Sequence, residues 1–278
     1  MIKINKPKFW DKQIGFLSIL FFPLSLVFLF LIFLKKKIVK ERKFKIPIIC
    51  VGNIYIGGTG KTPTSVLLAK ELSKSGKKPV ILRKYYKHHN DEHYLIKNHF
   101  KNLIVTKNRL IGLKEVEDSD FDIAILDDGL QDYNIKKNQK IVCFNSNQLD
   151  GNGLVLPAGP LRETLYTLKN VDIVLINGDK VQDFENKILN INKKIEIFYS
   201  SYKPTNLEEF KNKKLLAIAG IGNPENFFQT IEKNNLDISK KIIFPDHYEF
   251  SRNEIQNIVD EAKSNNYQII MTEKDYFK

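Results

Sequence analysis

Residues 57–62 read Gly-Gly-Thr-Gly-Lys-Thr, a glycine-rich run that ends in a cation and a hydroxyl. An apolar, β-like stretch, Ile46–Val51, precedes this run, and a helical segment follows it from Pro63. Glycines let backbone N–H groups surround phosphate oxygens, while the lysine reaches the β- and γ-phosphates and the threonine can bind Mg²⁺. The run therefore predicts a phosphate-binding loop for a nucleoside triphosphate.

One position departs from the strict phosphate-loop pattern. That pattern has a glycine five residues before Gly60, where this chain has Tyr55. The alternative interpretation, a glycine-rich turn with an incidental lysine, leaves the order of strand, turn and helix unexplained. The predicted ATP-binding residues are Tyr55, Ile56, Gly57, Gly58, Thr59, Gly60, Lys61 and Thr62.

A second chemical signal is a pair of acids at the end of an apolar strand-like run. The run Phe121–Leu126 is followed directly by Asp127 and Asp128. In phosphate-loop enzymes, an acid at the end of a neighbouring strand positions the Mg²⁺ bound to the nucleotide. We therefore predict a magnesium site formed by Thr62, Asp127 and Asp128, without choosing between the two acids.

The segment Ile14–Leu34 contains no charged residue. As a helix it would extend about 30 Å, the thickness of a bilayer hydrocarbon core. Trp10 precedes it and the basic run of residues 35–45 follows it, as expected for interfacial and cytoplasmic flanks. A signal peptide fits poorly, because no small-residue cleavage site follows. We predict a membrane anchor, and the sequence leaves open whether it spans the bilayer or lies in one leaflet.

Composition sets the remaining bounds. The chain has 278 residues and a formal net charge of +12, which suits an anionic partner but does not identify one. Cys50 and Cys143 lie in apolar runs and are expected to be buried free thiols. Four histidines lie close together without regular ligand spacing and do not predict a metal site: His88, His89, His93 and His99.

Apolar strand-like runs alternate with helical stretches along the chain. This order predicts an α/β fold with a mostly parallel sheet covered by helices on both faces, and a second, smaller α/β domain. The helix after the loop should run over 64–75 and end at Gly76, and a capping box is expected from Ser251 to Glu254. The expected organisation is an anchor over 1–45, a nucleotide-binding domain over 46–176, a linker over 177–213, and a small domain over 214–278 that closes the active-site cleft.

Several short motifs occur together in a specific order. They are Phe9-Trp10, Val51-Gly52-Asn53, residues 57–63, Asp91-Glu92, Asp127-Asp128-Gly129 with Gln131, residues 156–163 (LPAGPLRE), Pro245-Asp246-His247 and Thr272-Glu273-Lys274-Asp275. With these motifs the chain resembles the tetraacyldisaccharide 4'-kinases, the membrane-bound lipid A 4'-kinases of Gram-negative bacteria. The resemblance implies transfer of the γ-phosphate of ATP to the 4'-hydroxyl of an acylated glucosamine disaccharide 1-phosphate. It also implies a location on the cytoplasmic face of the inner membrane.

The resemblance further implies roles for individual residues. Asp91 would be the catalytic carboxylate that accepts the proton of the 4'-hydroxyl, with His247 as its partner. Glu92 and Gln131 would lie near the metal, the nucleotide or the attacking group, and Arg109 would neutralise charge near the phosphates. The expected cofactors are ATP and Mg²⁺, and the expected partners are the lipid substrate and the bilayer.

Some positions depart from the family pattern. Lys84 stands where the family has glycine after its second strand, and Asn90 and His93 flank the Asp-Glu pair where glycine and proline are usual. Asp132 and Tyr248 stand where histidine is common. These changes concern the fine geometry around the acceptor, not the class of reaction.

Two other classes of function remain as alternatives. A membrane-associated regulatory ATPase of the partition or division-site type also uses a glycine-rich loop, but usually has a lysine where this chain has Ile56. A nucleic-acid-binding protein would suit the net charge. However, no basic-aromatic motif is present and the basic residues concentrate beside the apolar segment. The sequence does not indicate an oligomeric state.

Overall fold

The computed structural model describes residues 6–87 and 89–278, so His88 and residues 1–5 lie outside it. The chain forms two compact units. The larger unit comprises Lys6–Tyr85 and Ile96–Ser201, and the smaller unit comprises Tyr86–Leu95 and Tyr202–Lys278. Each unit is described by itself below.

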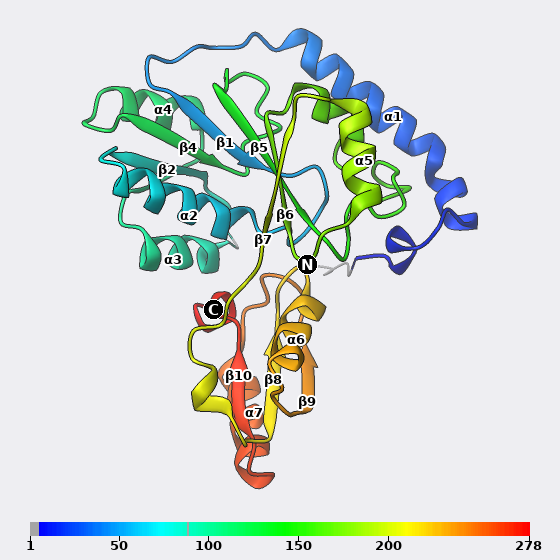
Figure 1. The fold of residues 1–278 in the computed structure, drawn as a ribbon, viewed down its shortest axis with the longest axis vertical. Coiled ribbons are helices and arrows are strands. Elements are labelled where there is room, and N and C mark those ends of the chain that lie inside the picture. The colour runs from blue at the N-terminus through cyan, green and yellow to red at the C-terminus, as the bar shows by residue number, and fades with distance from the viewer. Residues whose placement is uncertain (1–5, 88) are drawn as a thin grey trace. The chain divides into compact units, whose positions relative to one another are not determined.

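The larger unit is built on a sheet of seven parallel strands among the described residues (Figure 1). In spatial order the strands are β3 (Leu103–Thr106), β2 (Pro79–Lys84), β4 (Ile123–Asp127), β1 (Ile48–Gly52), β5 (Gln139–Asn145), β6 (Ile173–Asn177) and β7 (Glu196–Ser200). The central strands are runs of apolar residues without polar alternation, because helices cover both faces of the sheet. The predicted α/β class is confirmed.

Two apolar clusters fill the two faces of this sheet. On one face, Cys50 and Leu126 pack with residues of α4 (Arg109–Glu117) and α5 (Gln182–Ile191). On the other face, Val51 and Ile125 pack with residues of α2 (Lys61–Lys74) and with Ile96 of α3 (Asn90–His99). Helix α2 ends at Lys74 with Ser75 as its C-cap, one residue before the predicted end, and the left-handed Gly76 (φ 79°) follows as the sequence predicts.

Both cysteines are buried free thiols, as the sequence predicts. Burial raises the pKa of Cys50 and of Cys143 to about 12, so both remain protonated at neutral pH. A thiol that stays protonated is a poor nucleophile.

Helix α1 (Phe16–Ile38) follows the short 3₁₀ helix η1 (Lys8–Asp11) and lies against the larger unit (Figure 1). Among the described residues, it is the one helix with the length and apolarity to cross a membrane. Ser18 and Ser25, two turns apart, are buried against the body of the unit, while most of its large apolar side chains are exposed. The apolar helix predicted from the sequence is thus present. Its polar stripe, Ser18 and Ser25, packs against the rest of the larger unit, and most of its apolar surface is exposed.

The smaller unit has its own three-stranded parallel sheet. In order the strands are β10 (Gln268–Met271), β8 (Leu215–Ala219) and β9 (Ile238–Ile243). The other elements of this unit are α6 (Pro224–Lys233), α7 (Arg252–Ser264), the one-turn α8 (Glu273–Tyr276) and the 3₁₀ helix η3 (Leu207–Phe210). A further 3₁₀ helix, η2 (Leu165–Asn170), belongs to the larger unit. Ser251 and Glu254 form the predicted capping box of α7.

The structure differs from the expected organisation in two places. Residues 177–213 are not a linker throughout, because they carry α5 and the edge strand β7 of the seven-stranded sheet. The short apolar stretch within that range pairs with β6, which makes it part of the larger unit. Residues 86–95, expected within the nucleotide-binding domain, group with the smaller unit.

Candidate active site

The predicted phosphate-binding loop connects β1 to α2, at the carboxyl edge of the parallel sheet. Gly57 (φ 112°) and Gly60 (φ 85°) both adopt left-handed backbone conformations, which glycine tolerates without steric cost. Gly60 is the residue that caps the amino-terminal end of α2, so Lys61 and Thr62 are its first residues. The loop therefore ends at a helix N-terminus, where backbone N–H groups and the helix dipole favour a bound anion.

Two asparagines from strand ends hold this loop in shape. The amide of Asn53 donates to Thr59 Oγ1 at 3.0 Å and to the carbonyl of Gly57 at 3.3 Å. From the end of β6, the amide of Asn177 donates to the carbonyl of Thr59 at 2.6 Å. Both asparagines are buried, so these bonds are shielded from water and fix the loop before any ligand binds.

Tyr55 and Ile56 have other partners in the structure. The backbone N–H of Ile56 donates to the carbonyl of Pro160 at 2.9 Å, and Tyr55 forms a β-bridge with Leu161. The buried Tyr55 hydroxyl donates to Asp11 at 2.6 Å. These two residues fasten the start of the loop to residues 160–161, and their assignment to the nucleotide stays a prediction.

Asp127 lies at the end of β4, next to β1, and is fully buried. Its Oδ1 accepts from Ser65 Oγ at 2.9 Å, and its Oδ2 accepts from Thr62 Oγ1 at 3.2 Å. Arg83, at the end of β2, forms an ion pair with the same Oδ2. The structure thus brings the hydroxyl and carboxylate of the predicted magnesium site together, because β1, β2 and β4 end at one edge of the sheet.

Asp128 has a different environment, although it is the next residue. Its backbone is left-handed (φ 57°), and its carboxylate lies 3.7 Å from Lys61 Nζ and 3.0 Å from Arg162 Nη1. Burial alone would raise the pKa of Asp128, but the charges of Lys61 and Arg162 outweigh it and hold the pKa below its ordinary value. Burial lowers the pKa of Lys61, and Asp128 opposes that effect.

Arg109 and Gln131 connect the strand ends to the surrounding segments. Arg109 begins α4 and is buried, where it donates to the backbone carbonyl of Asp127 and pairs with Asp132. Gln131 donates to the carbonyl of Asn53 and to Glu163 Oε1, each at 3.1 Å. Both predicted residues therefore lie beside the loop and the acids, in positions that brace them.

In the smaller unit, Asp91 and His247 form a close pair. Asp91 is in the first turn of α3 and His247 is in the turn after β9, with a left-handed backbone (φ 56°). Both carboxylate oxygens of Asp91 lie 3.0 Å from His247 Nδ1. The two side chains are thus in direct contact, although 156 positions separate them, and their catalytic roles stay a prediction.

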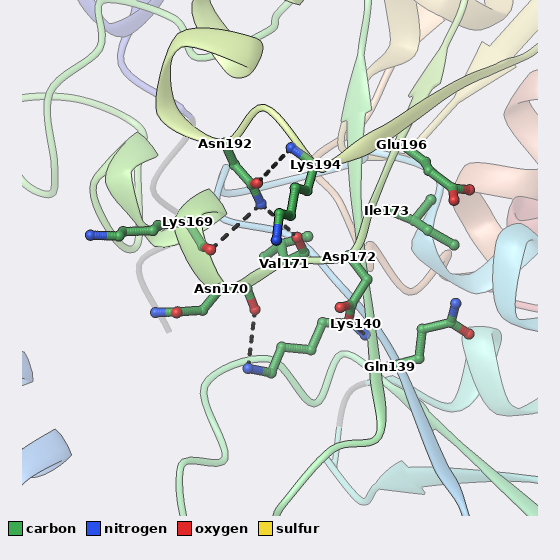
Figure 2. Close-up of a pocket in the computed structure, with 10 residues that line it drawn as sticks. All are labelled: Gln139, Lys140, Lys169, Asn170, Val171, Asp172, Ile173, Asn192, Lys194 and Glu196. Atoms are coloured by element: carbon green, nitrogen blue, oxygen red, sulfur yellow. Dashed lines mark hydrogen bonds between the residues drawn. The ribbon is translucent and has the colours of Figure 1, made fainter.

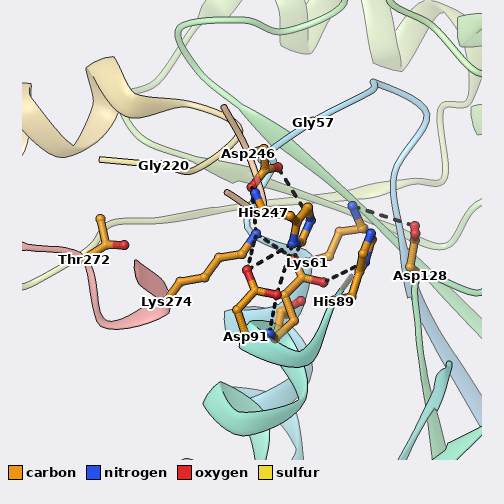
Figure 3. A network of polar contacts seen from close by, with 12 residues as sticks. Gly57, Lys61, His89, Asp91, Asp128, Gly220, Asp246, His247, Thr272 and Lys274 are labelled. Atoms are coloured by element: carbon orange, nitrogen blue, oxygen red, sulfur yellow. Dashed lines mark hydrogen bonds and ion pairs between the residues drawn. The ribbon is translucent and has the colours of Figure 1, made fainter. Parts of the chain in front are cut away.

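Lys274 lies among three carboxylates of the same unit. Figure 3 shows it directed towards Asp246 and Asp91, and its Nζ lies 2.9 Å from Asp246, 3.0 Å from Glu92 and 3.7 Å from Asp91. Burial would raise the pKa of Asp91, but the His247 hydrogen bond and the charge of Lys274 more than offset this and lower it. The Asp91 side chain is therefore a carboxylate at neutral pH and can accept a proton.

A cavity of about 500 Å³ in the larger unit lies at the opposite edge of the sheet, where β5, β6 and β7 begin. Figure 2 shows its polar lining, in which Lys140 Nζ donates to the carbonyl of Asn170 at 3.1 Å. None of the predicted site residues lines it. The predicted site residues of the larger unit instead gather at the carboxyl ends of its strands, where ligands of open α/β sheets bind.

Several residues of these networks had no role assigned from the sequence. They are Asn53, Ser65, Arg83, Arg162, Glu163, Asn177, Asp246 and Lys274. Arg162, Glu163, Asp246 and Lys274 lie inside motifs that carry the family resemblance, which was the available signal. Ser65 had no such signal, because only the fold brings it to Asp127.

The chain is similar throughout to a family of known kinases. The sequence profile described as "Tetraacyldisaccharide-1-P 4'-kinase" matches residues 17–278. A tetraacyldisaccharide 4'-kinase from Pelagibacter ubique is 40% identical over 100% of this chain and 89% of that protein. Another from Francisella tularensis subsp. novicida is 34% identical over 92% of this chain and 88% of that protein.

A solved structure shares the fold. A crystal structure of LpxK from Aquifex aeolicus in complex with ATP has a TM-score of 0.69 and 22% sequence identity. The match covers 94% of this chain and 90% of that chain. The likeness therefore includes the fold of nearly the whole chain.

Proposed function

The chain belongs to the tetraacyldisaccharide-1-phosphate 4'-kinase family, and on that premise we propose that it phosphorylates a lipid A precursor. The donor is ATP, and the acceptor is the 4'-hydroxyl of a tetraacyl glucosamine disaccharide 1-phosphate. The contact between Asp91 and His247, in a chain with a phosphate-binding loop, carries this proposal. A loop alone suits many ATPases, whereas a carboxylate with a histidine partner suits removal of a proton from an alcohol.

The larger unit supplies the site for the phosphate donor. The backbone of Gly57–Gly60 and the ammonium of Lys61 hold the phosphates at the start of α2. Thr62 and Asp127 fit a magnesium ion, since both offer oxygen donors and lie 3.2 Å apart. When bound, Mg²⁺ neutralises charge on the phosphates.

Asp127 is the better candidate for the metal-positioning acid than Asp128. It contacts Thr62, the other predicted ligand, whereas Asp128 is held by two cations, Lys61 and Arg162. Among the described residues, the charge of Asp128 is compensated by two cations and that of Asp127 by one, Arg83, so Asp127 attracts a further cation more strongly. We assign Asp128 to the positioning of Lys61.

The smaller unit supplies the proton acceptor. Asp91 is ionised at neutral pH and accepts the proton of the 4'-hydroxyl as the oxygen attacks the γ-phosphorus. The bond between the γ-phosphorus and the bridging oxygen breaks, and ADP leaves. His247 orients the Asp91 carboxylate, and Lys274 fixes the neighbouring acids.

Helix α1 supports a location at a membrane surface. Ser25 Oγ donates to the carbonyl of Val155 at 2.8 Å and accepts from the N–H of Ala158 at 3.0 Å. Asn152 donates to Ser18 Oγ at 3.1 Å, so the polar stripe is bound at both turns. Because protein covers one side of the helix, lipid cannot surround it. We propose that the helix lies in one leaflet of the inner membrane, on the cytoplasmic face, and does not span it.

Protection from protease in sealed inverted vesicles tests this topology. Tags at both termini of the full chain should be cleaved together when the cytoplasmic face points outward. Cleavage of the C-terminal tag alone would indicate a spanning helix.

The activity is tested with the pure full-length protein in detergent, ATP, Mg²⁺ and the disaccharide 1-phosphate. The expected product is the acceptor with one added phosphate, detected by mass spectrometry. An acceptor that lacks the 4'-hydroxyl should give no product. Hydrolysis of ATP without any phosphorylated acceptor would overturn the proposal and favour a regulatory ATPase.

A further inference from the structure

Three side chains of the smaller unit form a cluster of metal-binding residue types. Potential ligand atoms of His89, Glu92 and His247 all lie within 4.8 Å of one another. His89 Nδ1 lies 3.7 Å from Glu92 Oε2, and His247 Nε2 lies 4.0 Å from Glu92 Oε1. The carboxylate of Glu92 thus faces one nitrogen of each imidazole.

The three ligand atoms, within 4.8 Å of one another, must move closer together to hold one small ion, and the His89 ring must turn out of its near-parallel stack on His247 so that both nitrogens face the ion. A tetrahedral zinc ion with bonds of about 2.0–2.1 Å holds its ligand atoms about 3.4 Å apart. The two nitrogen-to-oxygen distances exceed this value by only a few tenths of an ångström. Two histidines and a glutamate are a donor set of zinc sites that keep a fourth position open.

The surroundings of His247 also match those of a metal ligand. Histidines that bind metals almost always bind a carboxylate or carbonyl through the other ring nitrogen. His247 Nδ1 lies 3.0 Å from both carboxylate oxygens of Asp91, which leaves Nε2 towards Glu92. Asp91 therefore stands where a supporting carboxylate is expected.

The local charge favours a cation. Asp91, Glu92 and Asp246 surround the ammonium of Lys274, so these four side chains together carry an excess of negative charge. A divalent ion would offset that excess. Because two of the three donors are imidazole nitrogens, the site would favour Zn²⁺ over Mg²⁺, which prefers oxygen.

We propose that His89, Glu92 and His247 form an inhibitory site for a divalent transition metal, with Zn²⁺ as the expected ion. A bound ion holds Glu92 and Nε2 of His247 while Nδ1 stays on Asp91, so the added positive charge beside Asp91 disfavours its acceptance of a proton. The binding site stands on geometry alone, whereas the inhibition rests on the proposed kinase function.

A substitution at His89 can remove the ligand nitrogen and still keep an aromatic ring at that position. The rings of His89 and His247 stack with centroids 3.9 Å apart and planes within 12° (Figure 3 shows both side chains). His89→Phe keeps an aromatic ring in this stack and removes the ligand nitrogen. His99→Phe, at the exposed end of α3, the helix that begins directly after His89, is the matched control.

Binding is measured on the full-length protein in detergent after treatment with a chelator, by calorimetry with Zn²⁺ and by the visible absorption of added Co²⁺. Removal of a residue that only supports a ligand weakens metal binding about 10- to 100-fold, so His89→Phe should weaken it by at least about 100-fold. The absorption of tetrahedral Co²⁺ should be lost in this variant and kept in His99→Phe. Equal Zn²⁺ affinity in the wild type and His89→Phe would overturn the site.

Inhibition is measured separately as acceptor phosphorylation at rising Zn²⁺ and saturating Mg²⁺. The wild type should lose turnover as the site fills, and His89→Phe should keep it over that range. Metal binding that depends on His89 without any effect on turnover would overturn the inhibition and leave the site. A chain that binds the metal but phosphorylates no acceptor at all would contradict the proposed function instead.

Discussion

The two units place carboxylates in opposite electrostatic settings. In the larger unit, four cations form ion pairs with three acids at or near the strand ends. The cations are Lys61, Arg83, Arg109 and Arg162, and the acids are Asp127, Asp128 and Asp132. In the smaller unit, the ammonium of Lys274 faces Asp91, Glu92 and Asp246, and His247 lies beside the same three acids. Cations therefore outnumber acids in one region, and acids outnumber cations in the other.

This difference separates two parts of a phosphoryl transfer. An excess of cations beside backbone N–H groups suits a polyphosphate, which brings its own negative charge. A carboxylate that His247 and Lys274 keep ionised suits a site that accepts a proton, because the oxygen lone pair stays free for the hydroxyl proton. We infer that ATP affinity resides in the larger unit and proton removal in the smaller one.

The largest expected effect is that of Lys61→Ala. The loss of the ammonium weakens ATP binding and removes charge stabilisation in the transition state, so kcat/KM for ATP should fall about 10⁴-fold. Lys74→Ala on the exposed end of the same helix, where the lysine pairs with Glu71, is the matched control and should change nothing. Unaltered ATP affinity in Lys61→Ala would break the assignment of binding to the larger unit.

Asp91→Asn is expected to act on the chemical step alone. Removal of a positioned general base lowers kcat by about 10³-fold, and the Kd for ATP should stay at the wild-type value. Steady-state kinetics and calorimetry with ATP check the two quantities. Glu225→Gln, an exposed acid of α6, controls for loss of charge in the same unit. A matching loss of ATP affinity in Asp91→Asn would contradict the separation of roles.

These two residues also show what the sequence could and could not predict. Lys61 follows from local pattern, because a strand, a glycine turn and a helix adjoin in the chain and need no tertiary information. Asp91 and His247 lie 156 positions apart, and only the family resemblance linked them. A single acid or histidine in a polar segment carries no signal of its own.

Most strands and helices could likewise be predicted from local sequence pattern. Buried parallel strands are continuous apolar runs, which pattern identifies directly. The range 177–213 was misread as a linker, because the edge strand β7 alternates exposed and half-buried residues and has a weaker pattern. Arg83 shows the same limit, since its pairing with Asp127 depends on the order of strands in the sheet.

The third prediction concerns the stability of the larger unit. Asp127→Ala leaves the buried guanidinium of Arg83 without its carboxylate, which should lower the free energy of unfolding by about 3 kcal/mol. Urea unfolding followed by the fluorescence of Trp10, the single tryptophan and a buried residue of this unit, measures it. Replacement of both partners, Asp127→Ala with Arg83→Met, should recover part of the loss.

An exposed ion pair of the smaller unit provides the comparison for that value. Lys241 and Glu232 are partly exposed and 2.7 Å apart, and Lys241→Ala should cost less than about 1 kcal/mol. Equal losses of unfolding free energy at the buried and the exposed pair would show that water reaches the Arg83 guanidinium when Asp127 is removed. The buried network would then not be rigid before ATP binds.

The smallest effect is expected at Thr272, which acts on Lys274 only through the helical turn that carries it. Thr272 Oγ1 accepts from the N–H of Asp275 at 3.2 Å and caps α8, the single turn that carries Lys274. Thr272→Val removes the cap, which typically costs about 1 kcal/mol, so kcat should fall about fivefold. Thr272→Ser restores the hydroxyl and should restore kcat, while ATP affinity stays constant in both variants. A loss that serine does not rescue would assign the effect to packing of the threonine methyl group. The acid-rich region would then depend less on the position of its ammonium than its contacts indicate.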